Sequence, residues 1–313
     1  MERAKGMRDD SVFDMIVIGG GPGGYTAALY AARAGLRVLV LEKLWAGGQM
    51  ALAHWIENYP GFPQGIDGHS LGSSMKAQAE RFGAVTGFAQ VTKVCLSENP
   101  KTVEAGGQRY YGKTLVLATG ARPRQLGLPG ERELLGRGIA YCAECDAMFY
   151  RGKTVAVVGG GNTAVSDAVL LSNVAAKVYL IHRKPALRAD RIDEEALKRA
   201  ANVTILWNSA VTALFAGEQL TGVQVTELPS GSRFTLECDG LFISIGRVPE
   251  TELFANQLEL TPGGYIPAGE ATETAIPGVY AVGDVRGKPL CQIVTAMSDG
   301  AVAAHRAQEY LAQ

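Results

Sequence analysis

A strand, a glycine-rich turn and a helix occur twice in this chain, and the two copies lie 140 residues apart. In the first copy a strand is expected at residues 13–18, the turn spans residues 19–24, and a helix is expected at residues 25–34. The next strand, residues 36–41, ends at Glu42. The spacing G-x-G-x-x-G between a strand and a helix is typical of a unit in which the turn admits a dinucleotide pyrophosphate and an acidic residue accepts ribose hydroxyls. The first copy therefore predicts a site for FAD or NAD, with a ligand-free turn as the alternative.

The second copy differs from the first where its second strand ends. It consists of a strand at residues 155–158, the turn at 159–164, a helix at 165–172 and a strand at 178–181. The position that corresponds to Glu42 starts a group of basic side chains, which are His182, Arg183, Lys184 and Arg188. A carboxylate would repel a 2′-phosphate, whereas arginine can bind it through two hydrogen bonds. We therefore expect NADP at the second copy, and a solvated basic start of a helix is the alternative.

The segments around the second copy predict how the chain is divided. Two apolar strands, residues 114–118 and 240–245, run into Gly-x-x-Pro segments that bracket the second copy. A last strand and helix, residues 278–284 and 292–309, return to the first domain. The sequence thus predicts an α/β fold of two Rossmann-like dinucleotide-binding domains, the second inserted in the first. The expected boundaries are 1–121 and 249–313 for the outer domain and 122–248 for the inserted domain.

Two cysteines with two residues between them, Cys142 and Cys145, lie between the two glycine-rich turns, and Asp146 follows directly. A C-x-x-C pair serves redox chemistry, zinc binding or a structural role. Zinc needs two more ligands, and the sequence has no second C-x-x-C and no closely spaced pair among its four histidines. A position after a flavin-type copy and just before a nicotinamide-type copy favours redox chemistry. A buried, inert pair is the alternative.

The composition excludes several classes of partner. The chain has 313 residues, 47% of them hydrophobic, with 30 basic and 31 acidic side chains and a net charge of -1. This balance gives no reason to expect nucleic acid or an anionic membrane as a partner. Residues 1–10 are charged and lack the apolar core of a signal peptide, and no long apolar run occurs. We therefore expect a cytoplasmic protein.

With these motifs in view, residues 13–311 resemble the low-molecular-weight thioredoxin reductase family of flavoprotein disulfide reductases. The motifs that carry the resemblance occur in the family's order: residues 19–24, Gly47-Gly48-Gln49, residues 57–61, residues 118–120, residues 142–146, residues 159–164, His182-Arg183 and Gly283-Asp284. The resemblance implies that the outer domain binds FAD and that the inserted domain binds NADPH and carries a redox disulfide. It also implies a homodimer whose partner is thioredoxin or a thioredoxin-like protein.

The resemblance also implies the residues of the site. For FAD they are Gly19, Gly21, Pro22, Gly24, Glu42, Gly48, Gln49, Asn58, Thr119, Gly120, Gly283, Asp284, Gln292 and Ile293. For NADPH they are Gly159, Gly161, Asn162, Thr163, Ala164, His182, Arg183, Lys184 and Arg188. No metal site is expected.

The chemistry that the resemblance implies is a relay of two electrons. A nicotinamide delivers hydride, a flavin accepts it, and a disulfide takes the electrons from the flavin. By resemblance Cys142 is the thiol that attacks the external disulfide, Cys145 faces the flavin, and Asp146 protonates the departing thiolate. A helix that begins near Cys142 would favour its thiolate. Because disulfide and nicotinamide must both reach one flavin, we expect the inserted domain to rotate about residues 120–123 and 246–249.

Three positions depart from the family pattern and leave the electron donor open. Lys184 stands where the family commonly has a second arginine, Ser166 where it has a glutamate, and Cys291 where it has an arginine. Lysine lacks the two-pronged phosphate contact of arginine. The alternatives are therefore the same disulfide reduction with ferredoxin or reduced flavin as the donor, a flavin dithiol oxidase that passes electrons to oxygen, and a flavin-bound redox sensor without turnover.

Overall fold

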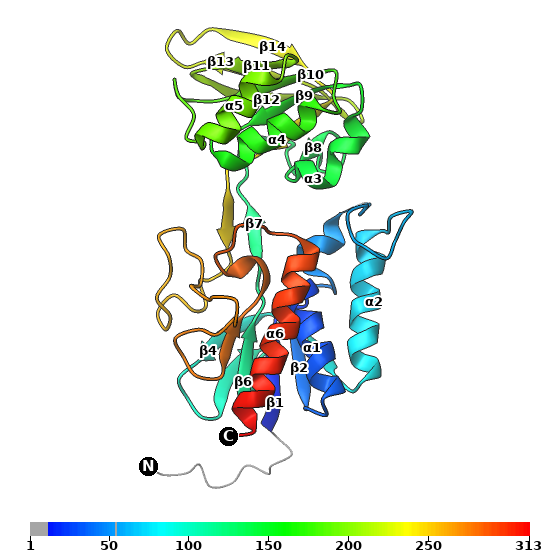
Figure 1. Cartoon of the computed structure of the whole chain (residues 1–313), viewed down its shortest axis with the longest axis vertical. Coiled ribbons are helices and arrows are strands. Elements are labelled where there is room, and N and C mark those ends of the chain that lie inside the picture. Colours follow the sequence, from blue (N-terminus) through cyan, green and yellow to red (C-terminus); the bar gives the residue numbers. More distant parts are fainter. Residues whose placement is uncertain (1–11, 54) are drawn as a thin grey trace. The chain divides into compact units, whose positions relative to one another are not determined.

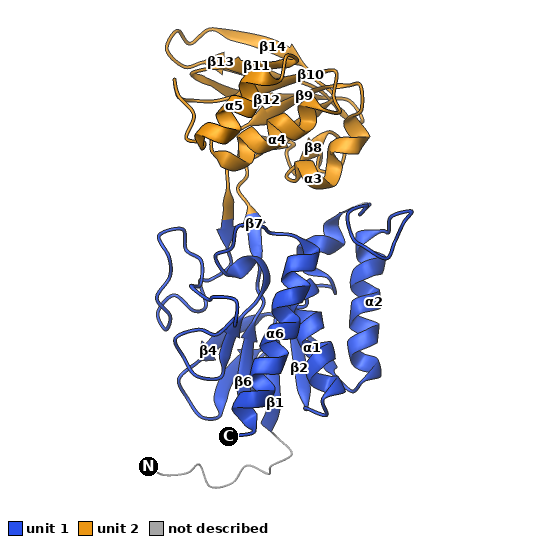
Figure 2. Cartoon of the chain, viewed as in Figure 1, with its two compact units in different colours: residues 1–122, 248–313 blue, residues 123–247 orange. Residues whose placement is uncertain are grey.

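The computed structural model describes residues 12–53 and 55–313, and these fall into two compact units (Figure 2). Unit 1 consists of residues 12–122 together with Val248–Gln313, and unit 2 is Pro123–Arg247. The expected boundaries at 121/122 and 248/249 lie one residue from these. The prediction that residues 1–10 are not a signal peptide concerns a segment outside the described residues. In the part of the chain that is described, no helix combines the length and the apolar character needed to cross a membrane.

Unit 1 is built on a mixed sheet with the strand order β3-β2-β1-β6-β5-β4, and β17 pairs with the C-terminal residues of β6. The parallel strands are β1 (Val12–Ile18), β2 (Val38–Glu42), β3 (Val85–Phe88), β6 (Gln108–Leu117) and β17 (Val279–Ala281). The antiparallel strands are β4 (Val91–Cys95) and β5 (Lys101–Ala105).

Both faces of β1 are buried from Met15 to Ile18, which explains the apolar run in this part of the strand. Met15 and Val17 belong to the core under the helices α1 (Pro22–Arg33), α2 (Gly68–Arg81) and α6 (Ile293–Leu311), which lie together in Figure 1. Ile16 and Ile18 point into a second core on the other face of the sheet. The α1 and α6 helices pack closely, because a Cβ added at Gly300 would lie 2.2 Å from the carbonyl oxygen of Gly23.

Unit 2 contains a parallel sheet with the order β11-β10-β9-β15-β8. Its strands are β8 (Ile139–Ala140), β9 (Thr154–Val158), β10 (Lys177–Ile181), β11 (Val203–Leu206) and β15 (Gly240–Ile243), and its longer helices are α4 (Asn162–Ser172) and α5 (Arg191–Arg199). A separate antiparallel sheet is formed by β12 (Ser209–Ala216), β13 (Leu220–Glu227) and β14 (Arg233–Glu237). The order of the parallel strands is that of a dinucleotide-binding half, so the predicted α/β fold class is confirmed.

The two segments that join the units are paired with each other. The β7 strand (Ala121–Pro123) and the β16 strand (Arg247–Pro249) form a two-stranded sheet. Backbone hydrogen bonds continue on either side of it, from Glu250 to Gly120 at 2.9 Å and from Arg124 to Gly246 at 2.9 Å. The chain therefore leaves and re-enters unit 1 through one narrow ribbon.

Candidate active site

The first glycine-rich turn has glycines of two kinds. Gly19 and Gly24 are required by packing, because an added Cβ would lie 2.4 Å from the Ala118 carbonyl oxygen at Gly19 and 2.0 Å from the Gly19 carbonyl oxygen at Gly24. Gly21 is different, since its backbone is extended (φ -78°, ψ -175°) and an added Cβ would meet nothing within 4 Å. Gly21 is the N-cap of α1, Pro22 follows it, and no side chain caps the helix. The turn thus leaves open space at a helix N-terminus, which is what a pyrophosphate needs.

Glu42 at the end of β2 fastens this turn to the sheet. Its Oε2 atom accepts a hydrogen bond of 2.6 Å from the Gly20 amide, and its Oε1 atom accepts one of 2.7 Å from the Lys43 amide and one of 3.2 Å from the Leu44 amide. Only 9% of the residue is exposed. A carboxylate oxygen has two lone pairs, so Glu42 keeps acceptor capacity for a ribose hydroxyl beside the turn.

The other residues expected to bind FAD are gathered near the first turn from distant parts of the chain. A Cβ at Gly48 would lie 3.4 Å from the Gly21 Cα atom, so the segment around Gly48 and Gln49 touches the turn. Thr119 and Gly120 directly follow Ala118, which packs on Gly19. These contacts fit a flavin nucleotide that lies along the carboxyl ends of the parallel strands.

The start of α6 joins the same group. Asn58 donates a hydrogen bond of 3.2 Å from its Nδ2 atom to Oε1 of Gln292, a residue 234 positions away. Gln292 is the N-cap of α6, and Ile293 is the first residue of that helix. The turn at Gly283-Asp284 lies against the same helix, because a Cβ added at Gly283 would be 3.5 Å from the Ala296 Cβ atom.

The second glycine-rich turn repeats the open position of the first. Gly161 is the extended N-cap of α4, and an added Cβ there would meet nothing within 4 Å. The loop after β10 is joined to the turn, because the Arg188 amide donates a hydrogen bond of 2.7 Å to the Gly160 carbonyl oxygen. Asn162 contributes its side chain to this joint, donating 2.8 Å to Asp190 and accepting 3.0 Å from the Asp190 amide. The open turn and its basic neighbour fit a phosphorylated dinucleotide.

The basic side chains expected around residue 182 differ in their exposure to solvent. Arg183, Lys184 and Arg188 are exposed, whereas His182 is only 4% exposed. The His182 ring occupies the space where a side chain on Gly160 would lie, and its Nε2 atom is 3.0 Å from the carbonyl oxygen of Ala186. Burial lowers the pKa of His182, so it is neutral at pH 7. The positive charge of the group therefore comes from its arginines and lysine, and His182 shapes the loop.

The two cysteines of the C-x-x-C segment form a disulfide. Cys142 and Cys145 are bonded, with their Cα atoms 5.3 Å apart, and both residues are partly exposed. Cys142 is the N-cap of a short helix, α3 (Ala143–Asp146), and its carbonyl oxygen accepts hydrogen bonds from the amides of Cys145 and Asp146. The helix begins where it was expected, but with four residues its dipole is small. Any activation of the thiol therefore depends mostly on other groups.

Asp146 directly follows Cys145 in the sequence, and its amide donates a hydrogen bond of 3.1 Å to the Cys142 carbonyl oxygen. Burial raises the pKa of its carboxyl group to about 6. A carboxyl with this pKa holds a proton in part of the molecules at neutral pH, so it is able to donate that proton to a thiolate. Next to it, Met148 and Phe149 are large apolar side chains that are 49% and 46% exposed.

Three clusters of buried polar side chains were not foreseen from sequence motifs. Glu131 accepts hydrogen bonds from the amides of residues 126–128 and one of 2.6 Å from the hydroxyl of Tyr141, which precedes Cys142. Asp167 on α4 accepts a hydrogen bond from Ser244, and burial raises its pKa to about 6. The third cluster consists of Arg286, Lys288 and Asp299. Its signal in the sequence is a charged residue on the buried, small-residue face of α6.

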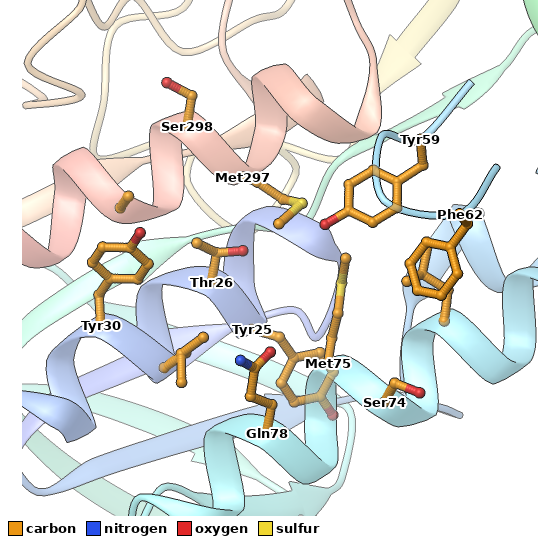
Figure 3. A pocket seen from close by; sticks show the side chains of 13 residues that line it. Tyr25, Thr26, Tyr30, Tyr59, Phe62, Ser74, Met75, Gln78, Met297 and Ser298 are labelled. Carbon is orange, nitrogen blue, oxygen red and sulfur yellow. The ribbon is translucent and has the colours of Figure 1, made fainter. Parts of the chain in front are cut away.

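A cavity of about 470 Å³ lies in unit 1, and its lining includes Tyr25 and Tyr59, which follow Gly24 and Asn58 in the sequence. Figure 3 shows Tyr59, Phe62, Met75 and Met297 around it, between α1, α2 and α6. None of the residues that line it is among those expected to bind FAD. The redox and dinucleotide features described above therefore define the candidate site without it.

The chain is similar to known proteins over almost its whole length. Residues 13–300 match the family described as pyridine nucleotide-disulphide oxidoreductase. The chain is 41% identical to the thioredoxin reductase of Listeria monocytogenes, covering 97% of this chain and 95% of that protein. It is 39% identical to the thioredoxin reductase of Bacillus subtilis, covering 97% and 96%. The crystal structure of the thioredoxin reductase of Streptococcus pyogenes aligns with a TM-score of 0.89 at 37% identity, covering 97% and 99%.

These similarities confirm the predicted class of enzyme. The family uses a flavin and a pyridine nucleotide to reduce a disulfide, and the bonded Cys142–Cys145 pair fits its redox-active centre. The chain is thus a flavin-dependent disulfide reductase. It belongs to the pyridine nucleotide-disulphide oxidoreductase family, and within it to the low-molecular-weight thioredoxin reductases.

Proposed function

We propose that this protein moves electrons from NADPH through FAD and the Cys142–Cys145 pair to thioredoxin or a thioredoxin-like protein. The observation that carries the proposal is the partly exposed disulfide, which belongs to the same compact unit as the second dinucleotide turn. The names of the relatives from Listeria and Bacillus supply thioredoxin as the acceptor. Unit 1 is then the FAD-binding domain, and unit 2 is the inserted NADPH-binding domain.

FAD is the flavin that the features of unit 1 favour. Gly21 leaves space for a pyrophosphate at the N-terminus of α1, and Glu42 supplies a carboxylate for the adenosine ribose. The N-terminus of α6 at Gln292 suits an electron-rich oxygen of the flavin ring. When bound, FAD accepts a hydride equivalent from the nicotinamide and passes two electrons to the disulfide.

NADPH is the donor that the features of unit 2 favour. The hydrogen bond from the Arg188 amide to the Gly160 carbonyl oxygen holds an exposed arginine beside the open turn at Gly161. Arg183 is exposed in the same loop and adds a second guanidinium. Two guanidinium groups there would stabilise a bound 2′-phosphate dianion, whereas they would add little binding energy for a free 2′-hydroxyl.

The exchange with the protein substrate uses this chain's own sulfur atoms. In the reduced pair the Cys142 thiolate attacks one sulfur of the substrate disulfide, which forms a mixed disulfide and releases the other substrate sulfur as a thiolate. The Cys145 thiolate then attacks the Cys142 sulfur, so that the Cys142–Cys145 bond forms again and the second substrate sulfur leaves. Asp146 directly follows Cys145, and burial raises its pKa to about 6. We assign to it the supply of a proton to a departing thiolate.

The substrate needs a surface on which to dock near the pair. Met148 and Phe149 follow the C-x-x-C segment within four residues and expose large apolar side chains. Exposed apolar side chains beside a redox centre favour a protein substrate over a small charged disulfide. We therefore assign them to the contact with the thioredoxin-like partner.

The proposal is tested by anaerobic mixing of the holoprotein with NADPH or NADH while the flavin absorbance is followed. We expect NADPH to reduce the flavin at concentrations at least tenfold lower than NADH. Arg188→Ala should weaken NADPH about 10–100-fold, because a charge-assisted contact contributes roughly 1.5–3 kcal/mol, and it should leave reduction by NADH unchanged. Lys198→Ala, which removes an exposed cation from α5, is the matched control.

The result also separates the other candidate functions. A flavin that neither nucleotide reduces would contradict the proposal and would point to ferredoxin or reduced flavin as the donor. Reduction by NADPH followed by rapid consumption of oxygen, without release of thiols from thioredoxin, would indicate a dithiol oxidase. We further propose, from the family resemblance, a cytoplasmic homodimer without nucleic-acid or membrane partners; sedimentation of the holoprotein tests the dimer.

A further inference from the structure

A buried network of charges lies behind the Gly283-Asp284 turn of unit 1. The Asp299 carboxylate on α6 accepts hydrogen bonds from Arg286 at 2.7 Å and 3.0 Å, from the Lys288 Nζ atom at 2.7 Å and from the Gly283 amide at 2.8 Å. The side chains of Arg286, Lys288 and Asp299 are only 6%, 4% and 6% exposed. Arg286 also donates to the carbonyl oxygen of Ala268 at 3.0 Å. The network thus fastens the turn to α6 and to the loop around residue 268.

The network carries more positive than negative charge. Burial would raise the pKa of Asp299, but the hydrogen bonds from Arg286 and Lys288 outweigh it and lower this pKa. The hydrogen bond to Asp299 raises the pKa of Arg286. The network therefore holds two basic side chains, Arg286 and Lys288, against one buried carboxylate. Glu270 lies 3.9 Å from Arg286, but its side chain is fully exposed and its charge is screened by water. Among the buried side chains of the network the surplus is one positive charge. The Asp284 carboxylate of the turn is partly exposed, and Cys291 is a further titratable side chain that acts on Arg286.

This surplus lies where the structure gathers the residues expected to bind the flavin. Asp299 holds the Gly283 amide directly, and its neighbour Gly300 packs on the carbonyl oxygen of Gly23 in the first glycine-rich turn. Lys288 lies in the short segment between the Gly283-Asp284 turn and the N-cap of α6 at Gln292. The positive end of the α6 dipole adds to the same field.

We propose that the buried charge of Lys288 raises the reduction potential of the flavin bound at this end of unit 1. Reduction adds negative charge to the flavin ring, and a nearby buried cation that water cannot screen stabilises the charged product. Arg286 and Asp299 neutralise each other, so Lys288 is the group whose removal leaves a balanced network. The inference rests on the FAD site of the proposed function and adds a residue that tunes the cofactor without contacting the substrate.

The test is the flavin potential of the Lys288→Met holoprotein, measured anaerobically against a reference dye at fixed pH and salt. Met fills a similar volume, and Asp299 keeps its bonds to Arg286 and Gly283, so the fold and the FAD content should be retained. We expect the equilibrium with the dye to shift about three- to tenfold toward oxidised flavin, roughly 15–30 mV for a two-electron couple. We expect the same shift for Lys288→Gln, which can be measured instead if Lys288→Met loses FAD.

Two controls separate charge from packing. Lys288→Arg keeps the charge and should keep the wild-type potential, and Lys76→Met removes an exposed lysine that pairs with Glu80 on α2 and should change nothing. A neutral variant with full FAD content and the wild-type potential would overturn the inference while the proposed function stands. A shift in Lys288→Arg as large as that in Lys288→Met would overturn it too, because charge would not be the cause. A wild-type protein that takes up no FAD would instead refute the proposed function together with the inference.

Discussion

At the scale of single residues, burial raises the pKa of two carboxyl groups in unit 2. Asp146 and Asp167 both have pKa values raised to about 6, and desolvation is the largest cause in each case. The two carboxyls differ in their partners. Asp167 is held by the Ser244 hydroxyl, whereas no other charged group contributes to the shift of Asp146. The hydrogen bond from Ser244 stabilises the ionised form of Asp167 and opposes the effect of burial, whereas the raised pKa of Asp146 comes from burial.

The raised pKa of Asp146 makes a prediction about stability against pH. The pKa of about 6 in the folded protein exceeds the ordinary aspartate value of 3.8, so the native state binds the proton more tightly than the unfolded state. This contribution to stability is fully present below pH 4 and is lost as the pH rises through 6. The Asp146→Asn variant has no carboxyl group at this position, so it does not lose this stability as the pH rises. We expect the unfolding free energy of the variant, relative to wild type, to be about 2–3 kcal/mol higher at pH 8 than at pH 4.

Urea unfolding of the two proteins at a series of pH values provides the measurement. Asp167 is present in both and cancels in the difference, which isolates Asp146. A difference that stays constant from pH 4 to pH 8 would show that the Asp146 carboxyl is solvated, and its role as a proton donor at neutral pH would lose its basis.

At the scale of elements, the repeated turns are the features that the sequence predicted best. The order strand, G-x-G-x-x-G, helix is set by local steric needs, and the structure meets them at Gly19 and Gly24. The helix that follows begins at Pro22, three residues before the predicted start, because proline at the first helical position is already in helical geometry. The β12–β14 sheet was not predicted, since register shifts in β12 at Val211/Ala213 and Phe215/Ala216 break the alternation of buried and exposed residues.

The glycines of the first turn yield a paired prediction. Gly24→Ala places a Cβ 2.0 Å from a backbone oxygen and should cost about 1–3 kcal/mol of stability or more. Gly21→Ala meets open space on an extended backbone, so the stability of the apoprotein should not change. The methyl group would then occupy the space of a bound pyrophosphate, and the affinity for FAD should fall about 10–100-fold.

Thermal unfolding of the apoproteins and titration with FAD measure the two effects. Gly161→Ala in unit 2 is the matched control, since it also meets open space and should leave the affinity for FAD unchanged while weakening NADPH. If Gly21→Ala binds FAD as tightly as wild type, the flavin does not lie against the α1 N-terminus.

At the scale of the whole molecule, two dinucleotide units in one chain explain why the class of enzyme could be predicted. The motifs that define it are local, each within about ten residues, and the family match over residues 13–300 agrees with them. The networks that complete the site are not local. Asn58 meets Gln292 across 234 residues, and Glu131 reaches Tyr141 through a hydrogen bond that no motif encodes. Such contacts depend on tertiary packing, and sequence periodicity gives no sign of them. The expected rotation of unit 2 stays a prediction.

The central claim is that electrons from NADPH reach the Cys142–Cys145 pair and leave it for a protein disulfide. The direct test mixes the FAD-loaded protein with NADPH without oxygen, quenches it with acid, and counts alkylated thiols on the peptide that contains both cysteines. We predict two new thiols per chain, which disappear when oxidised thioredoxin is added before the quench in excess over the NADPH. A flavin that NADPH reduces fully while the Cys142–Cys145 disulfide stays intact would contradict the account.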